Sequence, residues 1–289
     1  MADAQQPASG ANRPAARQFV PGSSLGVGPG PIMAIGGAED KLDDKLILST
    51  FVQLAGGRNA RISILPTASS FESAGERYKA IFLGLGVIEA EVVYLANRRD
   101  ADGPTAAESL EDASGVFMTG GNQMRLAAIV GGTRTAAKVK ERHAAGAIVA
   151  GTSAGASILS SHMVAYGASG STPRHRMAHM TAGFGLVPDV IVDQHFRQRD
   201  RIGRLLTMVA SNPGLLGVGV DEDTAALFHP AGTLEVIGRH SVTIVDGSAI
   251  YSNVFSVTGH APITISNAIL HVLTPGHRFD LTTRRLLDE

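Results

Sequence analysis

The stretch GTSAGAS at residues 151–157 decides the fold, and it directly follows the apolar run AAGAIVA at residues 144–150. An apolar run that ends in a glycine-bounded polar turn is typical of a buried strand in an α/β sheet. Glycine and alanine flank Ser153 on both sides, whereas a surface loop tolerates larger neighbours. The small neighbours indicate that backbone or substrate approaches Ser153 closely.

The segments on either side of this turn alternate between strands and helices. Apolar runs predict strands at 31–40, 60–69, 91–96, 115–123 and 147–155, and helical spacing predicts helices at 41–55, 72–86, 124–145 and from the turn through 163. This alternation predicts an α/β fold with a mainly parallel sheet and helices on both faces. After residue 232, TLEVIG, SVTIVD and AIYSNVF predict added antiparallel strands, which extend the sheet or pack beside it.

Composition excludes several classes of protein. The 289 residues carry 25 Lys and Arg against 26 Asp and Glu, so no global field attracts nucleic acid or a membrane surface. Cysteine is absent, which excludes disulfides and thiolate metal sites and fits a reducing compartment. Residues 1–30 are rich in Ala, Gly and Pro, lack the apolar core of an export signal, and predict a flexible tail. We expect a single domain over 31–289 in a cytoplasmic protein with no nucleic-acid or membrane partner.

GTSAG fits the pattern G-x-S-x-G, in which a sharp strand-to-helix turn exposes a serine hydroxyl. Ser153 is then a nucleophile, and the N–H of Ala154 faces an oxyanion at a helix N-terminus. The alternative is an ordinary helix start, with Thr152 or Ser153 as the N-cap residue. The position at the end of an apolar strand favours the nucleophile.

A histidine and an acidic group also follow apolar strands. His195 lies in VIVDQHFRQRDRIGRL at residues 190–205, and Glu222 lies between two aspartates in GVGVDEDTA at residues 217–225. One of the three acids is suited to orient the histidine as the third member of a triad. TGGNQ at residues 119–123 supplies glycine N–H groups for a second oxyanion donor, Gly121. We expect all these strand ends to converge at one edge of the sheet.

The arginines after His195 have two possible roles. Arg197, Arg199, Arg201 and Arg204 form either a solvated helix face or a clamp for carboxylates, and the neighbouring histidine favours the clamp for at least two of them. His175 and His179 stand four residues apart, but no third ligand with suitable spacing follows, so we expect no metal site.

Five motifs in this order, IGGAEDK (35–41), TGGNQ, GTSAGAS, DQHFRQRDRIGRL (193–205) and GVGVDEDTA, resemble the cyanophycinase family of serine peptidases, which is related to dipeptidase E. The resemblance runs from about Ile32 to the C-terminus. It implies a flavodoxin-like sheet of the class I glutamine amidotransferase kind, a homodimer, and no cofactor. It also implies exo-cleavage of cyanophycin (multi-L-arginyl-poly-L-aspartate) to β-Asp-Arg dipeptides through an acyl-enzyme.

The resemblance also implies roles for individual residues. By position, Ser153 is the nucleophile, His195 the general base and Glu222 the orienting acid. The family's substrate pocket corresponds to Gln123, Asp193, Gln194, Arg199, Arg201 and Arg204. Two positions depart from the pattern: Arg197 adds charge, and Asn122 stands where relatives commonly have an acid. The alternatives are a dipeptidase E-like enzyme that cuts short aspartyl peptides and a non-catalytic amidotransferase-like binding module.

Overall fold

The computed structural model describes residues 28–71 and 73–287. Most of the tail expected over residues 1–30, up to residue 27, lies outside this part of the chain. The N–H of Gly30 donates a hydrogen bond to the carbonyl of His143 (2.8 Å), so the packed structure includes Gly30. Within the described residues, no helix combines the length and apolar character that crossing a membrane requires.

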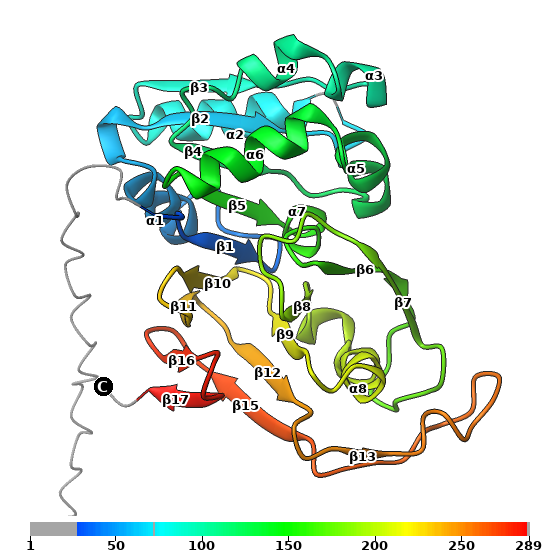
Figure 1. Ribbon diagram of the computed structural model, residues 1–289. Helices are drawn as coiled ribbons and strands as arrows, with labels where there is room; N and C mark the ends of the chain where they lie inside the picture. The colour runs from blue at the N-terminus through cyan, green and yellow to red at the C-terminus, as the bar shows by residue number, and fades with distance from the viewer. Residues whose placement is uncertain (1–27, 72, 288–289) are drawn as a thin grey trace, which may run out of the picture.

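A nine-stranded sheet forms the centre of the fold (Figure 1). Five strands run parallel in the order β1-β5-β4-β2-β3: β1 (Ile32–Ile35), β5 (Ile148–Thr152), β4 (Gly115–Met118), β2 (Arg61–Leu65) and β3 (Glu89–Val92). Four antiparallel strands continue from β1: β10 (Thr224–His229), β11 (Thr233–Gly238), β16 (Arg278–Asp280) and β17 (Arg285–Leu287). The predicted α/β class with its parallel core is confirmed.

Helices cover both faces of the parallel strands. On one face, α1 (Leu46–Leu54) and α2 (Ser73–Gly84) bury Phe51 and Phe82 against Phe117 of β4, with ring centroids 5.5 and 5.2 Å apart. On the other, α5 (Gln123–Val130), α6 (Arg134–Ala144) and α7 (Ala154–Ser157) pack on alternate residues of the same strands. The short elements η1 (Gly57–Asn59), α3 (Arg98–Ala101) and α4 (Pro104–Glu108) complete this half.

A second, four-stranded sheet lies beside the first. Its order is β15-β12-β9-β8: β15 (Ile269–Leu273), β12 (Val242–Asp246), β9 (Leu216–Val220) and β8 (Val190–Asp193). β8 and β9 are parallel, η2 (Arg197–Arg199) follows β8, and α8 (Ile202–Ser211) packs on β9 and β12. Two hairpins remain, β6 (His162–Gly167) with β7 (Ala178–Ala182) and β13 (Tyr251–Ser252) with β14 (Ile265–Ser266). The convergence of all strand ends on one sheet was therefore wrong, because β8 and β9 belong to the second sheet.

Two predicted helices also differ from the structure. The helix expected over 124–145 is two helices, separated at Gly131–Gly132 and restarted by the Thr133 side chain, which accepts from the N–H of Ala136. The helix expected through 163 ends at Ser157, because the following backbone pairs with a distant segment. The N–H of Phe184 bonds to the carbonyl of Ile158 at 2.7 Å. Tertiary pairing here overrides a helical pattern.

The two sheets meet at the glycine pair that follows β1. The carbonyl of Gly36 accepts from the N–H of His195 (2.8 Å), and the carbonyl of Gly37 accepts from the N–H of Asp223 (2.9 Å). A Cβ atom at Gly36 would lie 1.9 Å from the carbonyl oxygen of Asp221. The junction therefore requires a residue with no side chain.

We expect Gly36→Ala to lower the free energy of unfolding by about 2–3 kcal/mol, because the added methyl overlaps backbone that cannot retreat easily. Urea denaturation measures this change. Gly84→Ala is the matched control: no atom lies within 4 Å of its added Cβ, and we expect stabilisation or no change. Equal stability of Gly36→Ala and the wild type would show that the sheets do not depend on this contact.

Candidate active site

Ser153 lies between β5 and α7 in a strained backbone conformation, with φ 54° and ψ −110°. The glycines on either side make this turn possible. A Cβ at Gly151 would lie 2.0 Å from the carbonyl oxygen of Gly155, and a Cβ at Gly155 would lie 2.4 Å from that of Met118. The side chain of Ser153 makes no capping hydrogen bond to α7, so the alternative of a serine that merely caps the helix does not hold.

Three side chains form a continuous chain of hydrogen bonds. The Oγ of Ser153 lies 2.9 Å from Nε2 of His195, and Nδ1 of His195 lies 2.6 Å from Oε1 of Glu222. A neutral imidazole that donates from Nδ1 to the carboxylate leaves Nε2 free to accept the serine proton. The structure thus brings together the three residues that the sequence singled out, although they follow strands of two different sheets.

The neighbours of Glu222 are occupied elsewhere. Asp221 accepts hydrogen bonds from the N–H of Arg197 (3.0 Å) and the hydroxyl of Ser241 (2.9 Å). Asp223 accepts from the N–H of Asp40 (2.8 Å) and pairs with Arg239 (3.1 Å). Among the three adjacent acids, Glu222 is the one directed at the imidazole.

The surroundings of His195 favour its neutral form. Burial lowers the pKa of His195 below its ordinary 6.5. The hydrogen bond that Nδ1 donates to the carboxylate of Glu222 opposes this, and the positive charges of Arg199 and Arg201 lower the pKa further. The imidazole is therefore uncharged at neutral pH, and its Nε2 can accept a proton.

The backbone of Ala154 and the loop after β4 lie next to Ser153. Ala154 begins α7, and the loop after β4 approaches so closely that a Cβ at Gly120 would lie 3.3 Å from the Cβ of Ser153. In the part of the chain that the structure describes, the N–H groups of Ala154 and Gly121 donate to no other backbone carbonyl. Free N–H groups next to a nucleophile are the donors that an oxyanion requires.

Comparison with known proteins assigns the family. Residues 32–236 match Peptidase family S51. The chain belongs to this family. Curated cyanophycinases from Trichormus variabilis and Nostoc sp. are each 43% identical over 259 residues, covering 89% of this chain and 87% of their own. One from Synechococcus elongatus is 42% identical over 260 residues, covering 89% and 81%. The crystal structure of a peptidase from an acI-B1 Actinobacterium has the same fold, with a TM-score of 0.62 at 24% identity over 85% of this chain and 98% of that chain.

Most of the substrate residues expected from the resemblance form a buried cluster in this S51 peptidase. Asp193 is fully buried and is held in a fork by Arg204, whose Nε lies 2.6 Å from Oδ2 and whose Nη2 bonds to Oδ1. Arg201 is buried as well and contacts Asp193 (3.3 Å) and the side-chain oxygen of Gln194 (3.0 Å). Burial lowers the pKa of Arg201 to about 10, against the opposing charge of Asp193. Most of the hydrogen bonds of this cluster join its own members, whereas Nε of Arg201 is buried with no hydrogen-bond partner among the described residues.

Two expected substrate residues lie outside this cluster. The amide of Gln123 donates to the backbone carbonyls of Val164 (3.2 Å) and Ala165 (2.7 Å) and so fixes β6 to α5. Arg199 is exposed next to the buried cluster. Within the described residues, Arg199 is thus the expected pocket arginine with its charge open to solvent, and direct substrate contact by the others stays a prediction.

The motif IGGAEDK supplies residues whose roles the sequence alone does not predict. The carboxylate of Glu39 is buried and accepts from the hydroxyls of Thr152 (2.7 Å) and Tyr78, and it pairs with Lys41 (3.0 Å). Burial and this carboxylate raise the pKa of Tyr78 well above its ordinary value. Glu39 thus anchors Thr152, the residue before Ser153. In the sequence, the glycine pair Gly36–Gly37 followed by this acid at the end of an apolar strand was the pattern that could have indicated its role.

The described residues contain no group of three side chains placed as metal ligands. His175 contacts the carbonyl of Gly259 at 3.0 Å, whereas His179 lies in β7 and stacks on Tyr166 with ring centroids 4.7 Å apart. The two histidines four residues apart therefore have separate partners.

We expect Arg204→Ala to lower the free energy of unfolding by about 3–5 kcal/mol, since it leaves the buried carboxylate of Asp193 without its fork. Arg199→Ala removes an exposed arginine of the same segment and should change stability by less than about 0.5 kcal/mol. Denaturant titration of both variants measures the difference. Equal effects would contradict a structural role for the buried pair.

Proposed function

We propose that this S51 peptidase is a serine-type exopeptidase that hydrolyses cyanophycin to β-Asp-Arg dipeptides through an acyl-enzyme. The proposal rests on the hydrogen-bond chain from Ser153 through His195 to Glu222, because it places a nucleophile, a base and an orienting acid within hydrogen-bond distance of one another. The substrate follows from the relatives named cyanophycinase, which match 89% of the chain.

In the proposed reaction, the Oγ of Ser153 attacks an aspartyl carbonyl while Nε2 of His195 accepts the hydroxyl proton. Glu222 stabilises the imidazolium through Nδ1, and the N–H groups of Gly121 and Ala154 hold the oxyanion. His195 then gives the proton to the leaving amine. Water, deprotonated by the same imidazole, releases the acyl group and restores the serine.

A cavity of about 550 Å³ beside the nucleophile provides room for the substrate. Gly120, Gly121, Asn122 and Arg125 line it together with the loop after β2. Asn122 departs from the acid common in relatives, but its side chain accepts from the N–H of Met124 (2.9 Å) and caps α5, as an aspartate would. Arg125 and Arg199 are the exposed cations placed to meet the carboxylates of cyanophycin.

Two alternative functions have less support. A dipeptidase E-like enzyme would share the triad, but the curated relatives at 40–43% identity carry the name cyanophycinase. A non-catalytic binding module has no use for the strained conformation of Ser153 or for the carboxylate behind His195.

We also propose a homodimer in the cytoplasm. The absence of cysteine fits a reducing compartment. β15 is the edge strand of the second sheet and exposes 52% of Leu270 and 64% of Val272. An exposed apolar edge strand is suited to pairing with a second copy.

We expect Ser153→Ala to reduce dipeptide release from cyanophycin by about 10⁶-fold, below detection, because the nucleophile is lost. Mass analysis of the products of purified cyanophycin measures this release. Ser256→Ala changes an exposed serine and should leave the release of β-Asp-Arg unchanged. Undiminished release by Ser153→Ala would refute the assigned nucleophile.

The pH dependence tests the base. Protonated His195 cannot accept the serine proton, so kcat/KM should fall as the pH drops through a value below 6.5. In Glu222→Gln the carboxylate that raises the pKa of His195 is lost. This acidic limb should therefore move to lower pH, while the rate falls by about 10⁴-fold. An acidic limb that moves upward in Glu222→Gln would contradict the assigned pair.

A further inference from the structure

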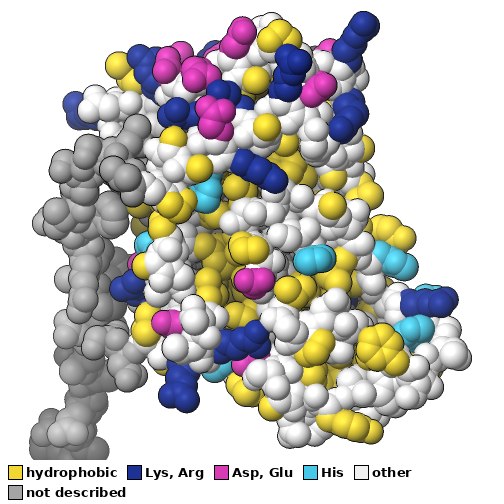
Figure 2. Space-filling model, viewed as in Figure 1, with side chains coloured by type: hydrophobic (Ala, Val, Ile, Leu, Met, Phe, Trp, Pro, Cys, Tyr) yellow, Lys and Arg dark blue, Asp and Glu magenta, His cyan; other side chains and the backbone are white. Residues whose placement is uncertain are grey.

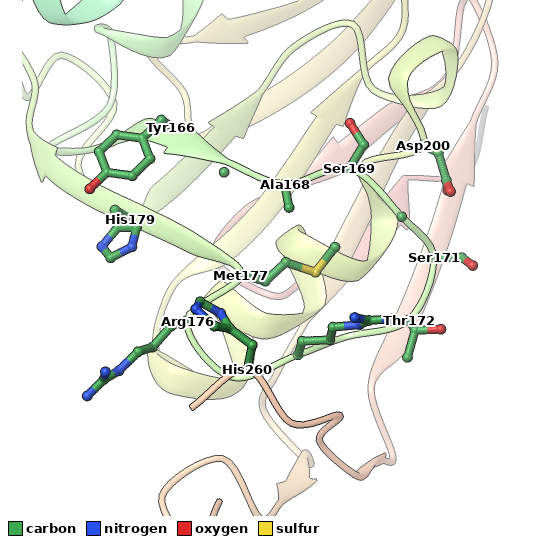
Figure 3. A pocket seen from close by; sticks show the side chains of 13 residues that line it. Tyr166, Ala168, Ser169, Ser171, Thr172, Arg176, Met177, His179, Asp200 and His260 are labelled. Carbon is green, nitrogen blue, oxygen red and sulfur yellow. The ribbon is translucent and has the colours of Figure 1, made fainter. Parts of the chain in front are cut away.

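A second cavity, of about 720 Å³, lies apart from the nucleophile between the β6–β7 hairpin and the loop that contains His260 (Figure 3). Its charged side chains are Arg174, Arg176 and Asp200. Histidines and basic side chains gather at the right-hand edge of Figure 2, where Figure 1 draws β7. The whole chain has a net charge of −1, so this gathering is local.

The charges in the cavity have no partners. Among the described residues, the side chains of Arg174, Arg176 and Asp200 make no ion pair or hydrogen bond. Arg176 and Asp200 stand at opposite ends of the cavity (Figure 3). Unpaired charges of both signs around one cavity are suited to bind a ligand that carries both a carboxylate and a cationic group.

The walls of the cavity are fixed in place. The N–H of Gly170 donates to the carbonyl of Asp200 (2.7 Å), and the N–H of Gly203 donates to the carbonyl of Gly170 (3.2 Å). On the other side, the N–H of His175 donates to the carbonyl of Ala261 (3.0 Å). A site built on such contacts needs little rearrangement to bind.

The cavity is also within reach of the triad. Asp200 follows His195 by five positions, so their Cα atoms are at most about 18 Å apart. Arg204, which holds Asp193, also donates to the carbonyl of Gly167 on the cavity wall (3.3 Å). An extended polymer backbone of about six residues spans even this upper limit.

We propose that this cavity is a second polymer-binding site, which holds the arginyl side groups of cyanophycin units remote from the bond being cut. The inference rests on the proposed function. Each β-linked arginine offers a carboxylate to the guanidinium groups of Arg174 and Arg176 and a guanidinium to Asp200. The stacked pair of Tyr166 and His179 offers an aromatic surface for the same guanidinium.

The test uses the full chain with Arg174→Ala/Arg176→Ala. We expect kcat/KM for cyanophycin to fall about tenfold through a higher KM, because two charge-assisted contacts are lost. The value for a two-unit oligomer, which has no unit remote from the bond being cut, should change much less. Asp200→Asn, which keeps shape and removes the charge, should shift the ratio of the two values in the same direction.

The control is Arg58→Ala/Arg134→Ala, which removes two exposed arginines on η1 and α6. It should leave the ratio of polymer to oligomer hydrolysis as in the wild type. An unchanged KM for cyanophycin in Arg174→Ala/Arg176→Ala overturns the second site while the proposed function stands. A wild-type chain that releases no dipeptide from cyanophycin overturns both. If polyaspartate, which has no arginyl groups, binds the enzyme as strongly as cyanophycin does, the recognition of arginyl groups is overturned.

Discussion

Three successive carbonyl groups at the end of β1 hold the whole candidate site together. Ile35 accepts from the N–H of Ser153 (2.9 Å), Gly36 from that of His195 (2.8 Å) and Gly37 from that of Asp223 (2.9 Å). Each donor lies in one of the three loops that carry the proposed nucleophile, base and acid, and Asp223 directly follows the proposed acid Glu222. Because neither glycine has a side chain, the imidazole can rest on Gly37, where a Cβ would lie 2.4 Å from its Cε1. One short backbone segment therefore sets the relative positions of groups from two sheets.

The same three donors share an unusual backbone conformation. Ser153, His195 and Asp223 have φ values of 54°, 46° and 49°, a region that residues with side chains rarely occupy. Such strain persists only where surrounding contacts over-determine it. The β1 carbonyls and the buried carboxylate of Glu39 behind Thr152 provide those contacts. The strain directs the serine hydroxyl and the imidazole toward each other instead of into their own chain segments.

Local patterns in the sequence were sufficient for the parallel strands, for the turn at Ser153 and for the selection of His195. Patterns could not assign β8 and β9 to a second sheet, because a buried parallel strand has the same composition in either sheet. They could not separate a clamp for substrate from a buried ion pair either. Arg204 and Arg199 are equivalent in the sequence, yet one is paired with Asp193 and the other is exposed. Burial, which decides between the two uses, depends on contacts distant along the chain.

One buried and one exposed arginine also affect the proposed base electrostatically. Arg201 and Arg199 lower the pKa of His195, as burial does, and all three keep the imidazole neutral before the reaction. A base whose pKa is too low accepts a proton poorly. The carboxylate of Glu222, 2.6 Å from Nδ1, opposes this effect because it stabilises the imidazolium cation once the proton has been transferred. Arg201, which belongs to the buried ion-pair cluster, therefore contributes both to the position of the loop, through Gln194, and to the pKa of His195.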